Sequence, residues 1–483
     1  MEIINKVDVL LINVSEDAEK NHRTRVGHGS HKGFVESQLA AGLAMAQSPH
    51  IGLAYLLAIT HKNEMDGHII DMAADDYAVE DILDYVDKHM PKIIGMTAFT
   101  IQVKSAGYIA SKIKERHPDI IIVLGGAHAT AMPVEALEEF SAFDCTVPGE
   151  GDVPWYNILN NMHTLSSIPG VVTRENYDKQ YVNKTVHSTP IKQIVRIEDL
   201  NEIPFPRWEG FNLSRYAGDC PHGTKLELPM STSRGCPYKC NFCSRMFGRK
   251  RKSRSIDSII EEMHRNVDVF GAEAIAFLDE TFVASKNFSR ELFQRMIDEG
   301  LNKKVKWSCE TTVHLDDPEF YALMKRAGCY YVFYGFESGN AEMLKRIGKG
   351  VHHKSQIVKA TKAAHSAGIV AVGSFILGLP GETEATVMES IEVAKTLYDH
   401  VYSITFPIAV PFPGTLARTY AETGEFGLKI LTNDWDFYGK QYPGVMDSDV
   451  LSIDRLRELQ AHAYEQIPKK NLDEFLHLKS QQA

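Results

Sequence analysis

The stretch Arg234-Gly235-Cys236-Pro237-Tyr238-Lys239-Cys240-Asn241-Phe242-Cys243 places three cysteines at spacings of four and three residues in one short polar loop. Thiolates are soft ligands that suit iron–sulfur clusters, zinc and copper(I). A closed zinc site or an ordinary cubane cluster takes four protein ligands, whereas this loop offers three. The spacing therefore predicts a 4Fe–4S cluster with one iron open to a small molecule. A zinc knuckle completed by a distant residue such as His222 is the alternative.

The pattern Cys236-x3-Cys240-x2-Cys243, with Phe242 just before the last cysteine, resembles the signature of radical S-adenosylmethionine (radical SAM) enzymes. The resemblance implies that the three cysteines hold the cluster and that Phe242 contacts S-adenosylmethionine. In that family the open iron chelates the amino and carboxylate groups of S-adenosylmethionine, and an electron from the cluster releases a 5′-deoxyadenosyl radical. The resemblance also implies an external electron donor such as flavodoxin or ferredoxin.

The composition of the 483 residues is that of a soluble globular protein with two or three domains. A net charge of −11 argues against nucleic-acid binding, which needs concentrated basic side chains. The one basic cluster, residues 249–254, is either a solvated surface or a face near an anionic substrate or the electron donor. We expect no membrane span, because no apolar run approaches ~20 residues. The absence of a signal peptide and of a disulfide framework predicts a reducing cytoplasm.

Strands and helices alternate over the first third of the chain. The hydrophobic patterns predict strands at residues 7–13, 68–72, 93–96 and 120–124, with helices between them. This order indicates βαβ units and a doubly wound, Rossmann-like parallel sheet over residues 5–160. Ligands of such sheets bind at the carboxyl ends of the strands. The dinucleotide fingerprint is missing after the first strand, and a structural or response-regulator-like sheet stays open on spacing alone.

The strand ends of this domain resemble those of the cobalamin-binding domain that precedes the cysteine loop in one large radical SAM class. That class includes the anaerobic magnesium-protoporphyrin ester cyclase and many C- and P-methyltransferases, and the resemblance covers residues 5–425. The matching parts are Gly-Gly-x-His and Gly-Glu-Gly elements. The residues that the resemblance assigns to cobalamin are Thr97, Thr100, Gln102, Gly125, Gly126, His128, Gly149 and Glu150.

One departure from methionine-synthase-like cobalamin domains concerns the lower face of the cobalt. Those domains carry Asp-x-His-x-x-Gly after the first strand, and this chain has no such motif there. We therefore predict that cobalamin binds without a histidine lower ligand. His128 is expected to touch the corrin tail or backbone, or to be an ordinary hydrogen-bonded histidine.

A mixed linker is expected over residues 161–228. Residues 170–174 and 180–183 could pair as a hairpin, and the Pro-rich segment 200–208 reads as extended. Phe205 and Trp208 in this segment are interpreted as packing residues that lay one domain against the other.

The βα alternation resumes after the cysteine loop and supports about six units over residues 229–425. It predicts a partial (β/α)6 radical SAM barrel with its site at the strand carboxyl ends, followed by a mostly helical C-terminal cap at 426–483. Any single carboxylate there could instead be a helix N-cap or a salt bridge, and Thr311 and Thr312 stand where family members often carry arginine. The residues that the resemblance places at S-adenosylmethionine in the barrel are Asp279, Glu280, Glu337, Ser338 and Gly378.

The leading functional hypothesis is a cobalamin-dependent radical SAM methyltransferase that acts on an unactivated carbon, or less often phosphorus, of a small molecule. One S-adenosylmethionine would methylate cob(I)alamin, and a second would yield the radical that takes a substrate hydrogen. The alternative is a non-methylating enzyme of the same architecture that performs oxidative cyclisation or ring rearrangement. A cluster-bearing sensor or scaffold is the third hypothesis, and the acidic strand ends argue against it.

Overall fold

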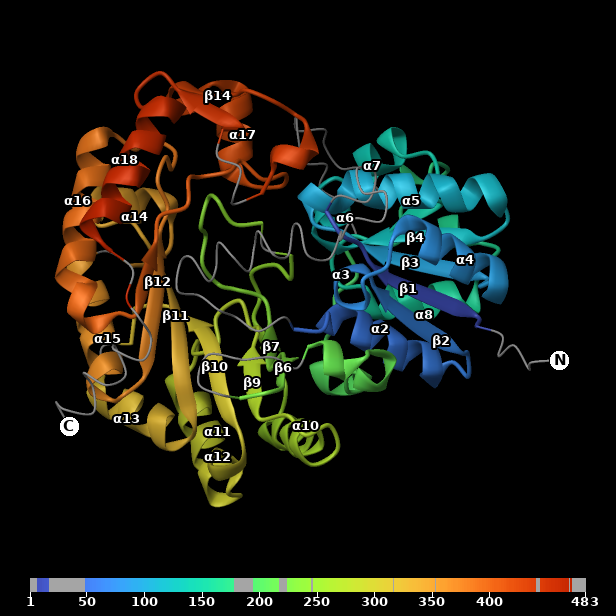
Figure 1. Ribbon diagram of the computed structural model, residues 1–483, viewed down its shortest axis with the longest axis horizontal. Helices are drawn as coiled ribbons and strands as arrows, with labels where there is room; N and C mark the ends of the chain where they lie inside the picture. The colour runs from blue at the N-terminus through green and yellow to red at the C-terminus, as the bar shows by residue number, and fades with distance from the viewer. Residues whose placement is uncertain are drawn as a thin grey trace.

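The computed structural model describes residues 7–16, 48–177, 194–216, 224–244, 246–315, 317–351, 353–439, 444–468 and 470. It contains two parallel sheets, each covered by helices, which lie side by side in Figure 1. The C-terminal segment, drawn in orange and red, passes over the top of both. The predicted α/β fold class, a Rossmann-like domain followed by a partial barrel, is confirmed.

The first sheet has the order β2-β1-β3-β4-β5, with all neighbouring strands parallel. Both of its faces are buried. Leu10 and Ile12 belong to one hydrophobic cluster, whereas Val9 and Leu11 belong to another on the opposite face. This double burial explains why the first strand reads as a continuous apolar run. The strands are β1 (Val9–Asn13), β2 (Gly67–Asp71), β3 (Ile93–Thr97), β4 (Ile121–Gly125) and β5 (Cys145–Thr146).

Helices cover both faces of this sheet. Their buried side chains divide between the same two clusters, so that α2 and α8 pack with Val9 and Leu11, and α4 and α5 pack with Leu10 and Ile12. The helices are α2 (Ile51–Lys62), α3 (Met72–Asp75), α4 (Val79–His89), α5 (Val103–Arg116), α6 (Gly126–Ala131), α7 (Pro133–Glu139) and α8 (Asp152–Asn160).

The second sheet has six parallel strands in the order β13-β12-β11-β10-β9-β6. Its helices form one outer layer and share a single large hydrophobic cluster with the strands. The strands are β6 (Glu227–Met230), β9 (Ala274–Phe277), β10 (Lys306–Thr311), β11 (Cys329–Glu337), β12 (Val370–Phe375) and β13 (Ser403–Thr405). The helices are α10 (Ile256–Asp268), α11 (Lys286–Asp298), α12 (Leu301–Lys304), α13 (Pro318–Arg326), α14 (Ala341–Ile347), α15 (Lys354–Ser366) and α16 (Glu384–Leu397).

The linker between the sheets contains short 3-10 turns rather than a continuous extended segment; they are η3 (Leu200–Glu202), η4 (Trp208–Gly210) and η5 (Leu213–Arg215). The Trp208 side chain is fully buried in the first domain's cluster. Its Nε1 donates a hydrogen bond to Oδ1 of Asn266 in α10, at 3.0 Å. Trp208 is thus a packing residue that joins the two domains. Of the predicted hairpin, residues 180–183 lie outside the described residues, and Val172 pairs with Thr146.

The C-terminal segment packs on both domains. Its last helix, α18 (Ile453–Gln466), buries Leu456 and Leu459 against the barrel. Earlier in the segment, η8 (Trp435–Phe437) places Trp435 in a hydrophobic cluster of the first sheet. The remaining elements are α17 (Leu416–Thr423), η7 (Glu425–Gly427), β14 (Leu428–Ile430) and β15 (Met446–Ser448). Among the described residues, no helix is long and apolar enough to cross a membrane.

We predict that Trp208→Ala lowers the free energy of unfolding by about 3–5 kcal/mol, as expected for truncation of a buried aromatic. Trp208→Phe should lower the free energy of unfolding by about 1–3 kcal/mol, because the side-chain oxygen of Asn266 loses its hydrogen-bond donor. Denaturant unfolding followed by circular dichroism measures both. Tyr156→Ala is the matched control, because that residue is 46% exposed and should lose much less packing. An unchanged midpoint in Trp208→Ala would show that the linker does not dock here.

Candidate cofactor site

The cysteine loop is closed at its stem by a short antiparallel pair, β7 (Ser233–Arg234) and β8 (Lys252–Ser253). Gly235 follows the stem with φ +92°, and a Cβ there would lie 2.5 Å from the carbonyl oxygen of Lys250. Only glycine permits this approach of the two chain segments. Within the loop, the amide of Cys236 donates to the carbonyl of Gly248 at 3.1 Å.

The middle of the loop is held by backbone hydrogen bonds to the barrel. The amides of Lys239 and Asn241 donate to the carbonyls of Gly348 and Ile347, at 3.1 and 3.0 Å. The Asn241 carbonyl in turn accepts from the amide of Ala417 at 2.9 Å. These contacts fix the backbone on both sides of the second cysteine, so the loop's shape does not depend on the metal alone.

Cys236, Cys240 and Cys243 are all half-buried, and none is in a disulfide. The Sγ of Cys236 lies 3.5 Å from the hydroxyl of Thr281. Burial raises the pKa of Cys240 to about 12, which keeps its proton in place until a metal ion displaces it. Three thiols outside any disulfide, on one anchored loop, are a donor set that fits a cluster with an open corner.

The zinc alternative needs a fourth protein ligand. Among the described residues, no group of three or more His, Cys, Asp or Glu that could hold a metal ion is found. The proposed fourth zinc ligand, His222, lies outside the described residues.

A buried ion pair stands beside the loop. Glu337, at the end of β11, accepts a hydrogen bond from Nζ of Lys349, and both side chains are almost fully buried. Burial opposes the charge on Lys349, but Glu337 and the nearby thiols Cys240 and Cys243 outweigh it and raise the lysine pKa. Glu337 has φ +63°, an unusual backbone conformation for a residue with a side chain. This backbone conformation sets the direction of the Glu337 side chain at the end of β11.

Three other residues predicted to contact S-adenosylmethionine already have structural partners. Asp279 accepts from the amide and hydroxyl of Thr232, at 3.0 and 2.8 Å, and from the hydroxyl of Ser233. The Ser338 hydroxyl accepts from the amide of Asn340 at 3.2 Å. The amide of Gly378 donates to Glu382 at 2.6 Å. Asp279 therefore braces the loop stem, while Ser338 and Gly378 shape the turns after β11 and β12.

Phe242 and Glu280 are the other two residues predicted to contact S-adenosylmethionine. Phe242 belongs to the cysteine loop, and its ring packs partly against the barrel's hydrophobic cluster. Glu280 is half-buried after the end of β9. It directly precedes Thr281, whose hydroxyl lies 3.5 Å from the Sγ of Cys236.

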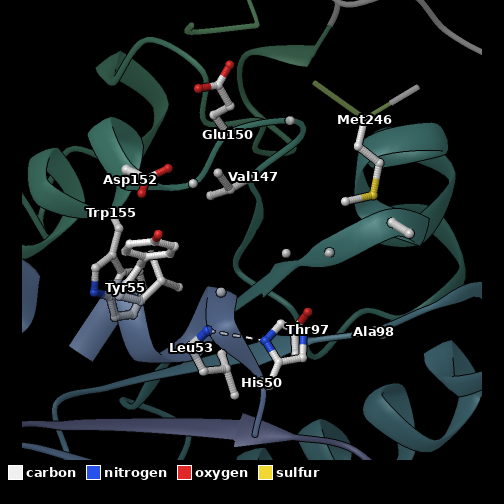
Figure 2. A pocket seen from close by; sticks show the side chains of 18 of the residues that line it. His50, Leu53, Tyr55, Thr97, Ala98, Val147, Glu150, Asp152, Trp155 and Met246 are labelled. Carbon is white, nitrogen blue, oxygen red and sulfur yellow. Dashed lines mark hydrogen bonds between the residues drawn. The ribbon is translucent and has the colours of Figure 1, made fainter. Parts of the chain in front are cut away.

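An interdomain cavity of about 960 Å³, partly open to solvent, lies between the strand ends of the first sheet and the cysteine loop. Figure 2 shows Tyr55 and Trp155 on one side and Met246 on the other. Gly95 and Val123 lie in the middle of β3 and β4, so the cavity reaches below the strand ends, between the sheet and helices α2 and α8.

Five of the eight residues predicted to bind cobalamin line this cavity, namely Thr97, Gly125, Gly126, Gly149 and Glu150. Thr100, Gln102 and His128 do not belong to the lining. Gln102 is occupied in joining strand ends, because its Nε2 donates to the carbonyl of Val14 at 2.7 Å and its Oε1 accepts from the amide of Phe99. The 3-10 turn after β3 withdraws Thr100 and Gln102 from the cavity.

His128 is fully buried, and its ring meets Trp435 edge to face at a centroid distance of 5.3 Å. Burial lowers the pKa of His128 to about 4, so the ring is neutral at ordinary pH. Its Nδ1 has no hydrogen-bond partner in the described part of the chain. His128 is thus a core residue of the contact with the C-terminal segment.

Glycines make room for a bulky ligand in this cavity. A Cβ at Gly125 would meet one protein atom within 4 Å, the carbonyl of Met96 at 3.8 Å, and at Gly151 only a methyl of Leu56 at 3.7 Å. Side chains at these two lining positions would therefore take up cavity space. Gly126 has φ +90°, where a side chain would also strike Thr97 and Ala98. The residues fit a large planar ligand that approaches the backbone closely.

Several lining residues were not singled out from the sequence, among them His50, Tyr55, Asp152, Trp155 and Arg234. Tyr55 and Trp155 lie within helical patterns, where a side chain that faces a cavity looks like one that faces the core. Arg234 carried a usable signal, because it immediately precedes the cysteine loop.

Comparison with known proteins gives the family. Residues 42–159 match the B12 binding domain and residues 230–394 match the radical SAM superfamily. The chain is 32% identical over 419 residues to an uncharacterized methyltransferase, PH0819, of Pyrococcus horikoshii, covering 86% of this chain and 87% of that protein. It is 28% identical over 360 residues to the anaerobic magnesium-protoporphyrin IX monomethyl ester cyclase of Cereibacter sphaeroides, covering 72% of this chain and 56% of the cyclase.

The fold is also that of a solved structure. The radical S-adenosylmethionine methyltransferase TsrM from Kitasatospora setae, with cobalamin and a [4Fe-4S] cluster bound, superposes with a TM-score of 0.70. The match covers 95% of this chain and 88% of TsrM at 17% sequence identity. The chain therefore belongs to the radical SAM superfamily, in the branch of enzymes with an N-terminal B12-binding domain.

Proposed function

We propose that this protein is a cobalamin-dependent radical SAM methyltransferase that methylates an unactivated carbon, or less often phosphorus, of a small molecule. The observation that carries the proposal is the interdomain cavity, which is lined on one side by the strand ends of the B12-binding domain and on the other by Met246 and Phe247 of the cysteine loop. Radical and methyl transfer require near-contact distances, and this cavity brings the strand ends of the B12-binding domain against the loop that carries the cysteines.

When bound, the cofactors supply the radical and the methyl group, and the chain supplies their positions. Cys236, Cys240 and Cys243 would hold the cluster. Glu337 and Lys349 would place one negative and one positive charge next to it, which suits the ammonium and carboxylate groups of S-adenosylmethionine. Thr97 and the glycines of the cavity would hold the cobalamin.

Methylation is preferred to ring closure because of the extent of the similarity. The P. horikoshii relative, named a methyltransferase, is matched over 87% of its length, whereas the cyclase is matched over 56%. Cyclisation or ring rearrangement is the second candidate, since the two reactions would use the same cofactors.

An external electron donor such as flavodoxin or ferredoxin would reduce the cluster. In the basic stretch beside the cysteines, Arg249 and Lys250 are exposed. Arg254 is buried and paired with Glu262, so it is structural. An acidic donor would therefore meet the first two residues rather than the whole stretch.

Product analysis tests the function. Anaerobically reconstituted protein with S-adenosylmethionine, a reductant and candidate substrates should yield both S-adenosylhomocysteine and 5′-deoxyadenosine, and a product heavier by one methyl group. Cys236→Ala should lose cluster iron and all 5′-deoxyadenosine, while Cys145→Ala, a buried cysteine of β5, keeps both. Formation of 5′-deoxyadenosine with an altered product of unchanged carbon count would favour cyclisation and overturn the methyl-transfer assignment.

We also propose that no histidine binds the lower face of the cobalt. The hydrogen bond that His50 makes in the cavity wall supports this proposal. His50 lines the cavity, and its Nδ1 accepts the amide of Leu53 at 3.2 Å as the N-cap of α2 (Figure 2). A neutral imidazole that accepts at Nδ1 carries its proton on Nε2. That nitrogen can donate a hydrogen bond to the ligand but cannot bind cobalt.

The electron paramagnetic resonance spectrum of the protein loaded with cob(II)alamin should therefore show no splitting from a histidine nitrogen. Labelling all histidines with ¹⁵N should leave the spectrum unchanged, as should His50→Ala. A splitting that changes on ¹⁵N-histidine labelling would contradict the prediction, and its loss in His50→Ala would identify the ligand.

The turn after β12 contains a buried carboxyl group whose titration can be measured. Oε2 of Glu382 accepts the amides of Gly378 and Leu379, and Oε1 has no partner in the part of the chain described. Burial outweighs the two amides and raises the pKa of Glu382 to about 8 from an ordinary value of 4.5. Between these values the folded state holds a proton that the unfolded state releases.

Stability should therefore fall as pH rises from about 5 to about 8, by up to about 1.4 kcal/mol per pH unit from this group. Glu382→Gln should flatten that slope, whereas Glu384→Gln, an exposed carboxylate paired with Arg455, should not. Urea midpoints across the pH range measure the difference. Parallel slopes for wild type and Glu382→Gln would contradict the raised pKa.

A further inference from the structure

Arg234 lies two residues before the first cysteine, and its side chain leaves the loop for the first domain. Its Nη1 and Nη2 donate to the two carboxylate oxygens of Asp152, the first residue of α8, at 2.6 and 3.2 Å. Nη1 also lies 3.3 Å from Oε2 of Glu150. Arg234, Asp152 and Glu150 are 9%, 8% and 3% exposed, so the contact is buried.

Two aromatic rings enclose the same guanidinium, one from each domain. Its central carbon lies 5.6 Å from the ring centroid of Tyr55 in α2 and 5.2 Å from that of Phe247 in the cysteine loop. Cation–π attraction holds a planar guanidinium against ring faces. The two hydrogen bonds to Asp152 therefore fix the direction of the Arg234 side chain, and the two rings enclose its guanidinium group.

Glu150 also connects the first domain to the far end of the cysteine loop. Its Oε1 lies 3.5 Å from Nη1 of Arg196, and that same Nη1 donates to the carbonyl of Met246 at 3.0 Å. Arg234 precedes the three cysteines and Met246 follows them. One carboxylate of the cavity wall thus restrains both ends of the loop.

A buried ion pair is a weak source of net stability, because removal of two charges from water offsets most of their attraction. Its specific contribution is geometry, since a bidentate arginine–carboxylate pair fixes distance and orientation together. A lysine would keep the charge without the fork. The arrangement around Arg234 therefore points to a positional role rather than to a reserve of stability.

We propose that Arg234 is a positioning residue that, through Asp152 and Glu150, sets the separation of the cluster loop from the cobalamin cavity. This inference rests on the proposed function only in that both cofactors bind, and it holds equally for methylation and cyclisation. Glu150, which the sequence pattern assigns to cobalamin, acts on the ligand indirectly by holding the loop.

The test measures the magnetic interaction between the two metal centres. In the reconstituted protein with cob(II)alamin and a reduced cluster, the cluster should speed the relaxation of the cobalt signal, an effect that weakens steeply with distance. Arg234→Met should lose this enhancement while iron and cobalamin contents stay near one cluster and one cobalamin per chain. Arg234→Lys should retain part of it, and Asp152→Asn should resemble Arg234→Met.

Arg290→Met is the matched control, because Arg290 also pairs with a carboxylate, Asp317 at 2.9 Å, and lies over an aromatic ring, Phe320, but this contact joins α11 to the start of α13 within the second domain. It should keep the full relaxation enhancement. The proposal is overturned if Arg234→Met keeps the enhancement, or if Arg290→Met loses it equally, since the effect would then not be specific to the contact between the domains.

If Arg234→Met fails to hold a cofactor, the milder Asp152→Asn decides by the same measurement. The absence of cobalamin or cluster from the wild-type protein would instead count against the proposed function. Where substrate is known, the Arg234 variants should lower turnover by roughly tenfold to a hundredfold, because misplacement by about 1 Å can cost that much.

Discussion

The fixed position of the cysteine loop is the restraint on which the rest of the site depends. Its stem is braced from inside the barrel, where Asp279 accepts three hydrogen bonds from Thr232 and Ser233. Arg254, paired with Glu262, donates to the carbonyl of Ser231 at 3.1 Å on the same stem. An open loop of this length would spread its thiols over many conformations, and the entropy of ordering them would oppose metal binding. Because these contacts order the loop, the entropic cost of bringing three thiols to a cluster is lowered.

Charged side chains are buried near the ordered cysteine loop, although most folds keep charged groups at the surface. Lys349 beside Glu337, Arg234 beside Asp152, and the carboxyl of Glu382 are all withdrawn from water, at a cost that apolar packing would not have. The left-handed backbone of Glu337 adds about 1–2 kcal/mol of strain. Glu337 and Lys349 lie beside the cysteine loop, and Arg234 lies two residues before its first cysteine. Interior charge and backbone strain are expected where geometry matters more than stability.

The fold class could be predicted from the sequence because it depends on local patterns, and the three cysteines were proposed as cluster ligands on the same kind of evidence. Apolar strands at βα spacing and three cysteines in ten residues need no tertiary information. The positions of the predicted cobalamin residues that lie outside the cavity depend on how the chain turns after a strand. Thr100 and Gln102 follow β3 as predicted, but a 3-10 turn redirects them, and only three-dimensional structure separates them from Thr97. The sequence left a contact between His128 and the corrin possible. In the structure the His128 ring packs against Trp435, which lies more than 300 positions further along the chain and could not be paired with it from the sequence.

The non-local contacts also settle how the two domains are held. Trp208 of the linker bonds to Asn266 of α10, a helix at the lower side of the molecule in Figure 1. Helices α5 and α7 lie at the upper side of the same view. Trp435 donates to Glu139 of α7 at 3.0 Å, and Lys104 of α5 pairs with Asp434 at 2.7 Å. A single hinge would let the domains open and change the width of the cavity between them. Attachment at two ends resists that rotation and keeps the width of the cavity constant. The contact from Arg234 to Asp152 adds a third attachment, and its short, directed bonds act on the cysteine loop itself.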